Sequence, residues 1–210
     1  MEEIAPGLWF WPSTHPRHGI RISSYYCADS GVVIDPMVPA EGLDWFRHRT
    51  PPSAVLLSNR HHLRDAGAFR EAFGARVLCN RLGAMEFGDG DGVEFFDAGD
   101  ELPGGVVAHP VGAICPDETA LHLRAHRALA VADGVVRIPH DGPLGFVPDA
   151  LMGDPQRTKA GLAGSYVRLA ELDFDHLLLA HGDPVVGGAA AALGEFATMA
   201  ALQVVDSQAG

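Results

Sequence analysis

Short apolar runs that end at turn residues make up much of the chain, and this pattern is typical of β-strands. The run at 54–57 is apolar throughout, which is typical of a strand buried on both faces. The run at 119–123 alternates instead, so Leu121 and Leu123 share one face and Ala120 and His122 the other. The segments that we predict as strands are 8–10, 23–27, 32–34, 54–57, 76–79, 93–96, 106–109, 119–123, 128–132 and 176–180.

Helical patterns are fewer, and we predict them over 41–49, from 65 to 74, over 158–172 and in the alanine-rich C-terminal segment. In the second, Asp65 suits an N-cap, Phe69 and Phe73 lie four residues apart, and Gly74 suits the C-terminus. Between the strands and the third helix, residues 137–157 hold four prolines and predict a long loop. Strands followed by mixed strands and helices favour a layered α/β (α+β) sandwich, and without a linker or repeat we expect one domain over 1–210.

The charge balance narrows the function classes. Fifteen Lys and Arg against 27 Asp and Glu give a formal net charge of −12. This balance argues against nucleic acid or an anionic membrane as the main partner. The first residues are acidic rather than basic, which predicts a cytoplasmic protein without an export signal. Three widely spaced cysteines are typical of reduced, mostly buried thiols rather than of a disulfide framework.

Polar residues stand at the ends of four predicted strands, where a core would not favour them. They are the segment 59–65, His109, Asp133 and the segment 181–183. A histidine or aspartate at a strand end lies at the edge of a sheet, where layered folds bind ligands. Two neutral imidazoles and a carboxylate can hold zinc, iron or manganese. The pattern therefore predicts a site for a small molecule or a metal ion.

In this order the segments resemble the metallo-β-lactamase superfamily over nearly the whole chain. Residues 4–9 and 31–36 look like its opening hairpins, and the strand 55–58 with the histidine-rich loop and Ala66-Gly67 looks like its signature loop. Residues 128–133 look like the strand that delivers the metal-bridging aspartate, and 177–185 like the closing strand with the last metal histidine. The resemblance implies a four-layer αββα sandwich with its site along the edge of both sheets.

The signature loop departs from the family pattern. Laid without gaps on Thr-His-x-His-x-Asp-His, residues 58–64 keep only His61 as a ligand. Leu63 cannot bind a metal, Arg64 cannot be deprotonated, and Ile114 stands where a further histidine is usual. The resemblance then leaves His61, Asp133 and His181 as metal ligands and implies at most one divalent ion, not a two-zinc centre.

Two interpretations remain open, and Asp133 and Arg64 are the candidate catalytic residues. In the first, one zinc, iron or manganese ion supports hydrolysis of small esters, thioesters, lactones or phosphoesters. In the second, Arg64 pairs with Asp133, replaces the metal charge, and leaves a metal-free small-molecule-binding module or pseudoenzyme. The oligomeric state stays open. The residues that we expect to line the pocket are Asn59, His62, Asp65, His109, His140 and Phe146.

Overall fold

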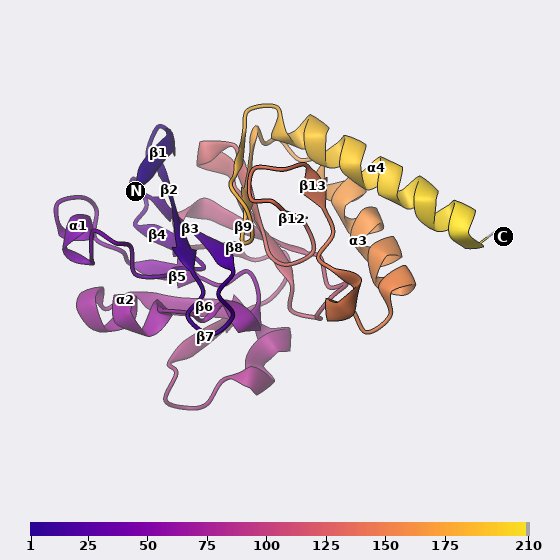
Figure 1. Cartoon of the computed structure of the whole chain (residues 1–210). Helices are drawn as coiled ribbons and strands as arrows, with labels where there is room; N and C mark the ends of the chain where they lie inside the picture. The colour runs from indigo at the N-terminus through magenta and orange to yellow at the C-terminus, as the bar shows by residue number, and fades with distance from the viewer. Residues whose placement is uncertain (209–210) are drawn as a thin grey trace.

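Two mixed β-sheets form the centre of the computed structural model, which describes residues 1–208 and the side chains of 1–203 (Figure 1). The first sheet keeps the chain order, antiparallel up to β4 and parallel from β4 onward. Its strands are β1 (Glu2–Ala5), β2 (Leu8–Thr14), β3 (Arg21–Cys27), β4 (Val32–Ile34), β5 (Ala54–Leu56), β6 (Arg76–Asn80) and β7 (Val93–Phe96).

The second sheet has the order β15-β14-β11-β10-β9-β8, with β11 and β14 parallel and the other pairs antiparallel. A small ribbon of β12 and β13 follows β11 along the chain. The strands of this sheet and of the ribbon are β8 (Glu101–Leu102), β9 (Val106–Pro110), β10 (Thr119–Leu123), β11 (Ala128–Val131), β12 (Val136–Arg137), β13 (Leu144–Gly145), β14 (His176–Leu179) and β15 (Val185–Val186).

Helices cover the outer face of each sheet. In Figure 1 α1 (Asp44–Arg47) and α2 (Ala66–Phe73) lie on the side of the first sheet, and α3 (Pro155–Leu169) and α4 (Ala189–Gln208) on the side of the second. Among the described residues, no helix combines the length and the apolar character needed to cross a bilayer. Short 3₁₀ turns complete the chain at η1 (Arg60–His62), η2 (Arg81–Glu86), η3 (Pro103–Gly105), η4 (Arg124–His126) and η5 (Asp149–Leu151).

Three apolar layers hold these elements together, one between the sheets and one under each pair of helices. In β5, Leu56 packs between the sheets and Val55 faces the helices α1 and α2. Leu121 and Leu123 likewise face the first sheet, and Ala120 faces α3 and α4. Because burial alternates along the strands between an inner and an outer layer, the sequence requires four layers. The predicted αββα sandwich is confirmed.

The elements differ from the predicted ones mainly at their ends. The helix expected over 41–49 is reduced to α1, because Gly42 has a φ of 76° and cannot continue a helix. The predicted long loop holds β13 and η5, and its last residues form the first turn of α3, which the Asp154 side chain caps at the Arg157 amide. The strand β1 and the two-residue strands β8, β12 and β15 were not predicted.

Candidate metal centre

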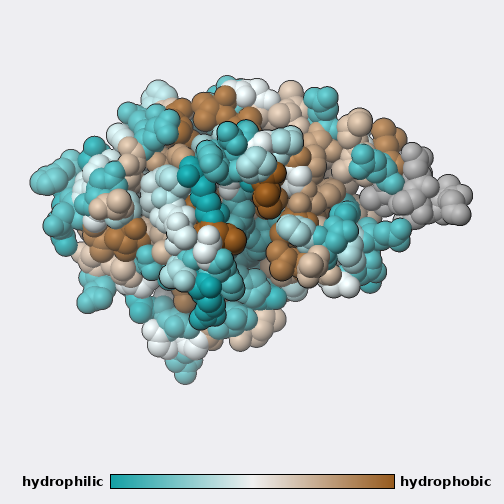
Figure 2. Space-filling view, in the orientation of Figure 1, coloured by the Kyte–Doolittle hydropathy of each residue, from teal (hydrophilic) through white to brown (hydrophobic). Residues whose placement is uncertain are grey.

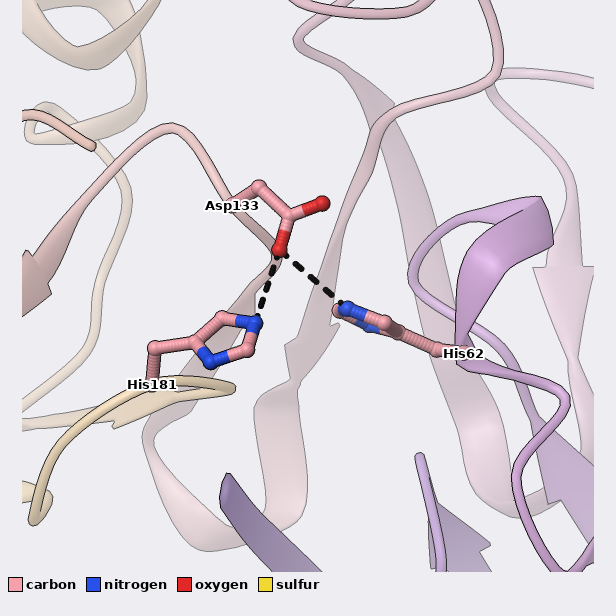
Figure 3. Close-up of side chains that lie close together, drawn as sticks. All are labelled: His62, Asp133 and His181. Atoms are coloured by element: carbon pink, nitrogen blue, oxygen red, sulfur yellow. Dashed lines mark hydrogen bonds and ion pairs between the residues drawn. The ribbon is translucent and has the colours of Figure 1, made fainter. Parts of the chain in front are cut away.

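Three ligand-bearing residues from three separate elements meet at one edge of the two sheets. His62 ends the 3₁₀ turn after β5, Asp133 follows β11, and His181 follows β14. Figure 3 shows both imidazole rings directed at the same oxygen of Asp133. The Nε2 atom of His181 lies 2.9 Å from Asp133 Oδ1, and that of His62 lies 3.2 Å from it. One potential ligand atom from each residue lies within 4.8 Å of the other two.

His62 is buried and held from behind by a carboxylate. Its Nδ1 lies 2.9 Å from Asp35 Oδ2 and 2.9 Å from the Ser58 hydroxyl, and Asp35 also accepts the Ser58 amide hydrogen at 2.8 Å. Burial by itself would lower the pKa of His62, but the charges of Asp35 and Asp133 outweigh it and raise that pKa to about 9. In the metal-free protein His62 is therefore a cation between two aspartates.

Asp133 is fixed from two sides. Its Oδ2 accepts a hydrogen bond from the side-chain amide of Asn59 (Nδ2) at 2.7 Å, which leaves Oδ1 to the two histidines. Burial would raise the pKa of Asp133, but His62 and His181 hold it well below its usual range. The next amide, Gly134 N–H, donates to Glu118 Oε1 at 2.8 Å, and a Cβ at Gly134 would lie 2.4 Å from Tyr166 Oη. The turn that carries Asp133 therefore requires glycine at the next position.

Arg64 does not make the predicted ion pair with Asp133. Its guanidinium donates to three backbone carbonyls instead, those of Ser23 at 2.7 Å, Asp35 at 2.7 Å and Ala180 at 3.5 Å. These carbonyls belong to β3 and to the ends of β4 and β14; those of Asp35 and Ala180 also accept from Ser24 Oγ and from the Ser23 amide, and each uses its second lone pair for Arg64. Arg64, with a φ of 42°, therefore ties both sheets together beside the site. The prediction of an Arg64–Asp133 pair is wrong because the carbonyls take its donors.

The histidine that the structure brings to the group is His62, where the sequence had placed His61. The loop is not extended: Asn59 caps a 3₁₀ turn by accepting the His61 amide hydrogen at 2.9 Å. Neighbouring side chains in such a turn point about 120° apart. His62 consequently enters the core and His61 is exposed. Asparagine is a favoured N-cap, so Asn59 was the available signal for this turn.

The other predicted site residues divide into those near the group and those elsewhere. Asn59 reaches Asp133, as described above, and His140 lies 2.8 Å from Asp183, two residues after His181. The Asp65 side chain accepts the Val38 amide hydrogen at 2.8 Å and makes no capping bond to α2. His109 stacks near His122, with 5.8 Å between the ring centroids, and is not part of the group.

Phe146 belongs to a different hollow, of about 350 Å³, beside α3 and α4. Its ring packs against Phe196 at 4.9 Å between centroids. Met199 and Lys159 also line this hollow. In Figure 2 hydrophobic residues are visible on this half of the molecule. The lining includes none of the residues of the His62–Asp133–His181 group, so this hollow is separate from that group.

The sequence did not single out several residues that shape the site. Asp35 and Ser58 orient His62, and Glu118 holds the Asp133 turn. Asp35 and Ser58 each directly follow a predicted strand of the first sheet, which is a signal that could have found them. Glu118 precedes a strand of the second sheet and has no comparable signal, because its role depends on contacts with residues distant in sequence.

The residues present fit one divalent metal ion. Two imidazole nitrogens and a carboxylate oxygen are a donor set that zinc, iron and manganese all accept. A carboxylate behind a ligating histidine, as Asp35 stands behind His62, fixes the ring and its tautomer. His62 must release its proton for this purpose, so the fit improves as the pH rises.

No protein-family model and no curated protein matches the sequence. Solved structures do match. A metallo-β-lactamase family protein from Thermus thermophilus is 15% identical with a TM-score of 0.66, over 96% of this chain and 80% of that one. The protein TTHA1623 in a di-iron-bound form is 20% identical with a TM-score of 0.63, over 89% and 99%.

A longer protein with a similar structure is the rubredoxin oxygen:oxidoreductase of Desulfovibrio gigas, at 14% identity and a TM-score of 0.62 over 94% of this chain. The chain covers 61% of that protein. Similarity at these identities extends to the fold and not to the reaction. With its two sheets, its outer helices and its edge site, the chain has the metallo-β-lactamase fold.

Proposed function

We propose that this protein holds one divalent metal ion through His62, Asp133 and His181 and hydrolyses a small ester, thioester, lactone or phosphoester. The observation that carries the proposal is the convergence of three potential ligand atoms within 4.8 Å from three elements. When bound, such an ion would lower the pKa of a water molecule toward neutral, and the ion itself would polarise a carbonyl or phosphoryl oxygen. The partner that we propose is a small molecule rather than nucleic acid, in keeping with the acidic chain.

The chain's own residues prepare the site. Asp35 accepts hydrogen bonds on the Nδ1 side of His62 and so directs Nε2 toward Asp133. The Asn59 amide engages one oxygen of Asp133 and leaves the other for a metal. Arg64 acts as a positioning residue, since it fixes the backbone of β3, β4 and β14 around these groups. Asp133, with its low pKa, is ionised throughout the neutral range.

A single ion is proposed because the residues beside the group lack ligand atoms or use them otherwise. Leu63 packs against the apolar layer below α2, and Ile114 against the layer below α3. The donors of Arg64 are engaged by carbonyls. Among the described side chains, His62, Asp133 and His181 are the residues that gather as a group of three potential ligands.

The second candidate is a metal-free binding module, and the charge state of His62 favours it. His62, with a pKa of about 9, is positive at neutral pH and is flanked by Asp35 and Asp133. The site is then electrostatically satisfied without a metal. In this candidate the replacing cation is His62, and not Arg64 as the sequence suggested.

The metal content of purified protein distinguishes the two candidates. We expect about one metal ion per chain in the wild type and a loss of most of it in His62→Ala and His181→Ala. His61→Ala is the matched control, since it removes the exposed neighbouring imidazole, and it should keep the wild-type content. Elemental analysis and titration with zinc or manganese measure both. Near two ions per chain would refute the single-ion proposal, and no binding at any pH up to 9 would leave the metal-free module.

A further inference from the structure

Arginines and histidines crowd the loop that carries His181. Three of the fifteen lysines and arginines of this acidic chain bind this loop or the residue before it, namely Arg21, Arg64 and Arg137. Arg137 lies directly against the loop. Its backbone amide donates to the His181 carbonyl at 3.0 Å, and a Cβ added at Gly182 would lie 2.7 Å from the Cβ of Arg137. The concentration is local, since the whole chain carries a net charge of −12.

The side-chain donors of two of these arginines bind carbonyls rather than carboxylates. Arg137 donates from its side chain to the carbonyls of Asp183 at 3.2 Å and Pro184 at 3.3 Å, and Arg64 donates to carbonyls as described above. A carbonyl satisfies the donors of a guanidinium but leaves its net charge in place. Arg137 therefore contributes a positive field at the loop, whereas the charge of Arg64 is offset by Asp35 and Asp133.

The hairpin between β2 and β3 brings further cations to the same edge. Ser23 binds the Ala180 carbonyl through its amide at 3.0 Å and the Gly182 carbonyl through its hydroxyl at 2.7 Å. Arg21, nearer the tip, pairs with Asp183 at 2.6 Å. The tip itself, residues 15–20, extends past this point and holds His15, Arg17 and His18. Hydrophilic residues cover the centre of the face in Figure 2, where β2 and β3 run in Figure 1.

The tip and the site interact electrostatically. Burial lowers the pKa of His15 first, and His18, Arg64, Arg17 and His181 lower it further. Each of these neighbours disfavours a positive charge on His15. A ligand of opposite charge would be favoured at the same place.

The nearby carboxylates are largely engaged. Asp183 uses one oxygen for Arg21 and the other for His140 at 2.8 Å, and Asp133 uses both for Asn59 and the two histidines. Among the described acidic side chains on these loops, Asp141 differs because its carboxylate is exposed and not engaged in this way. An entering molecule therefore meets donors and positive charge at this edge, and few free acceptors.

We propose that the site selects a small substrate that carries a carboxylate or phosphate group, received by the β2–β3 hairpin and the His181 loop. This inference rests on the proposed function for its hydrolytic step, but the recognition that it describes requires no metal. The proposal adds the requirement that the substrate is negatively charged. The anionic group of the substrate binds at the arginines, and its scissile bond lies toward Asp133.

The test measures anion binding by the protein as purified and after dialysis against EDTA. Inorganic phosphate, acetate and the neutral analogue acetamide are titrated while histidine resonances are followed by NMR. We expect phosphate and acetate to bind and acetamide to bind at least about tenfold more weakly, which corresponds to about 1.4 kcal/mol. Phosphate should bind more tightly than acetate, because it carries the larger negative charge.

Three variants locate the binding. The double variant Arg17→Gln/Arg21→Gln should weaken both anions about fivefold or more, since rim charges act mainly through the local field. Asp183→Asn should tighten them about twofold, because it removes a negative charge and releases Arg21. Arg76→Gln, which breaks an exposed pair with Glu94 away from this edge, is the control and should leave both affinities unchanged. Equal binding of acetamide, or unchanged affinities in the double variant, would overturn the charge requirement while leaving the metal result intact.

Discussion

The two histidines of the site are held in opposite ways. His62 is 4% exposed and is fixed by Asp35 and Ser58, both fully or almost fully buried. His181 has a side chain 20% exposed, and the neighbouring Asp183 pairs with Arg21 and His140 at the surface. The buried half fixes its geometry before any ligand arrives. The exposed half is held by pairs that solvent can reach.

The largest expected difference between the halves comes from removing the two supporting aspartates. Asp35→Ala should destabilise the protein by about 3–5 kcal/mol, because it leaves His62 and the Ser58 amide without their buried partner. Asp183→Ala removes only exposed pairs and should cost about 1 kcal/mol or less. Urea unfolding of both variants measures this.

Equal losses of unfolding free energy in Asp35→Ala and Asp183→Ala would contradict the difference between the halves. Asp35→Asn separates shape from charge, since it keeps the acceptor oxygen for the Ser58 amide but not the charge beside His62. The unfolding free energy of Asp35→Asn should lie between those of the wild type and of Asp35→Ala.

Glu118 extends the buried half to Asp133 and gives stability a pH dependence. Burial, with the charge of Asp133, raises the pKa of Glu118 from an ordinary 4.5 to about 7. Between these values the folded protein keeps a proton that the unfolded chain releases, so stability falls as the pH rises from about 4.5 to about 7. Glu118→Gln cannot ionise, and its stability relative to the wild type should rise by about 3 kcal/mol over that interval.

Unfolding free energies of wild type and Glu118→Gln, measured at several pH values, test this. Taking the difference between the two proteins removes the contributions of the other titrating groups. A difference that does not change with pH would show that Glu118 is ionised in the folded state at low pH.

Arg64 connects the two halves, because its three carbonyl partners lie in both sheets. Arg64→Ala should cost roughly 2–3 kcal/mol, the range for losing charge-assisted hydrogen bonds. Saturating zinc should stabilise Arg64→Ala no more than the wild type, since the lost partners are carbonyls and not Asp133. Thermal unfolding with and without zinc checks this. A larger zinc effect in the variant would restore the idea that Arg64 replaces a metal charge.

The fold was predictable because the pattern of burial is local. The alternation of Leu121 and Leu123 with Ala120, and the fully apolar run around Val55, each identify two covered faces. Turn residues such as Gly74, with a φ of 70°, mark where elements end. The sandwich needs only these signals, repeated along the chain. The missed strand β1 is exposed or half-buried along its length and carries little such signal.

The site was only partly predictable because it depends on one local conformation and on contacts distant in sequence. Asp133 and His181 follow apolar strands, so their placement at the sheet edge follows from the pattern. The exchange of His61 for His62 follows from a single 3₁₀ turn that a gapless comparison cannot represent. The partners of Arg64 are carbonyls 29 to 116 residues away. Composition gives no information about such acceptors.

The smallest expected effect concerns Phe146, which the sequence assigned to the exposed half. Its ring packs on Phe196 of α4 with 4.9 Å between centroids and an interplanar angle of 66°. Phe146→Ala should therefore cost about 1–2 kcal/mol of stability, as expected for a half-buried aromatic pair. Phe146→Leu, which keeps most of the apolar contact, should cost less than half as much. Metal content and phosphate affinity should not change in either variant, because the hollow that Phe146 lines includes no residue of the metal centre. If Phe146→Ala weakens phosphate binding while it leaves the unfolding free energy unchanged, the 146–149 segment belongs to the ligand-binding surface and the exposed half is larger than the His181 loop and the hairpin.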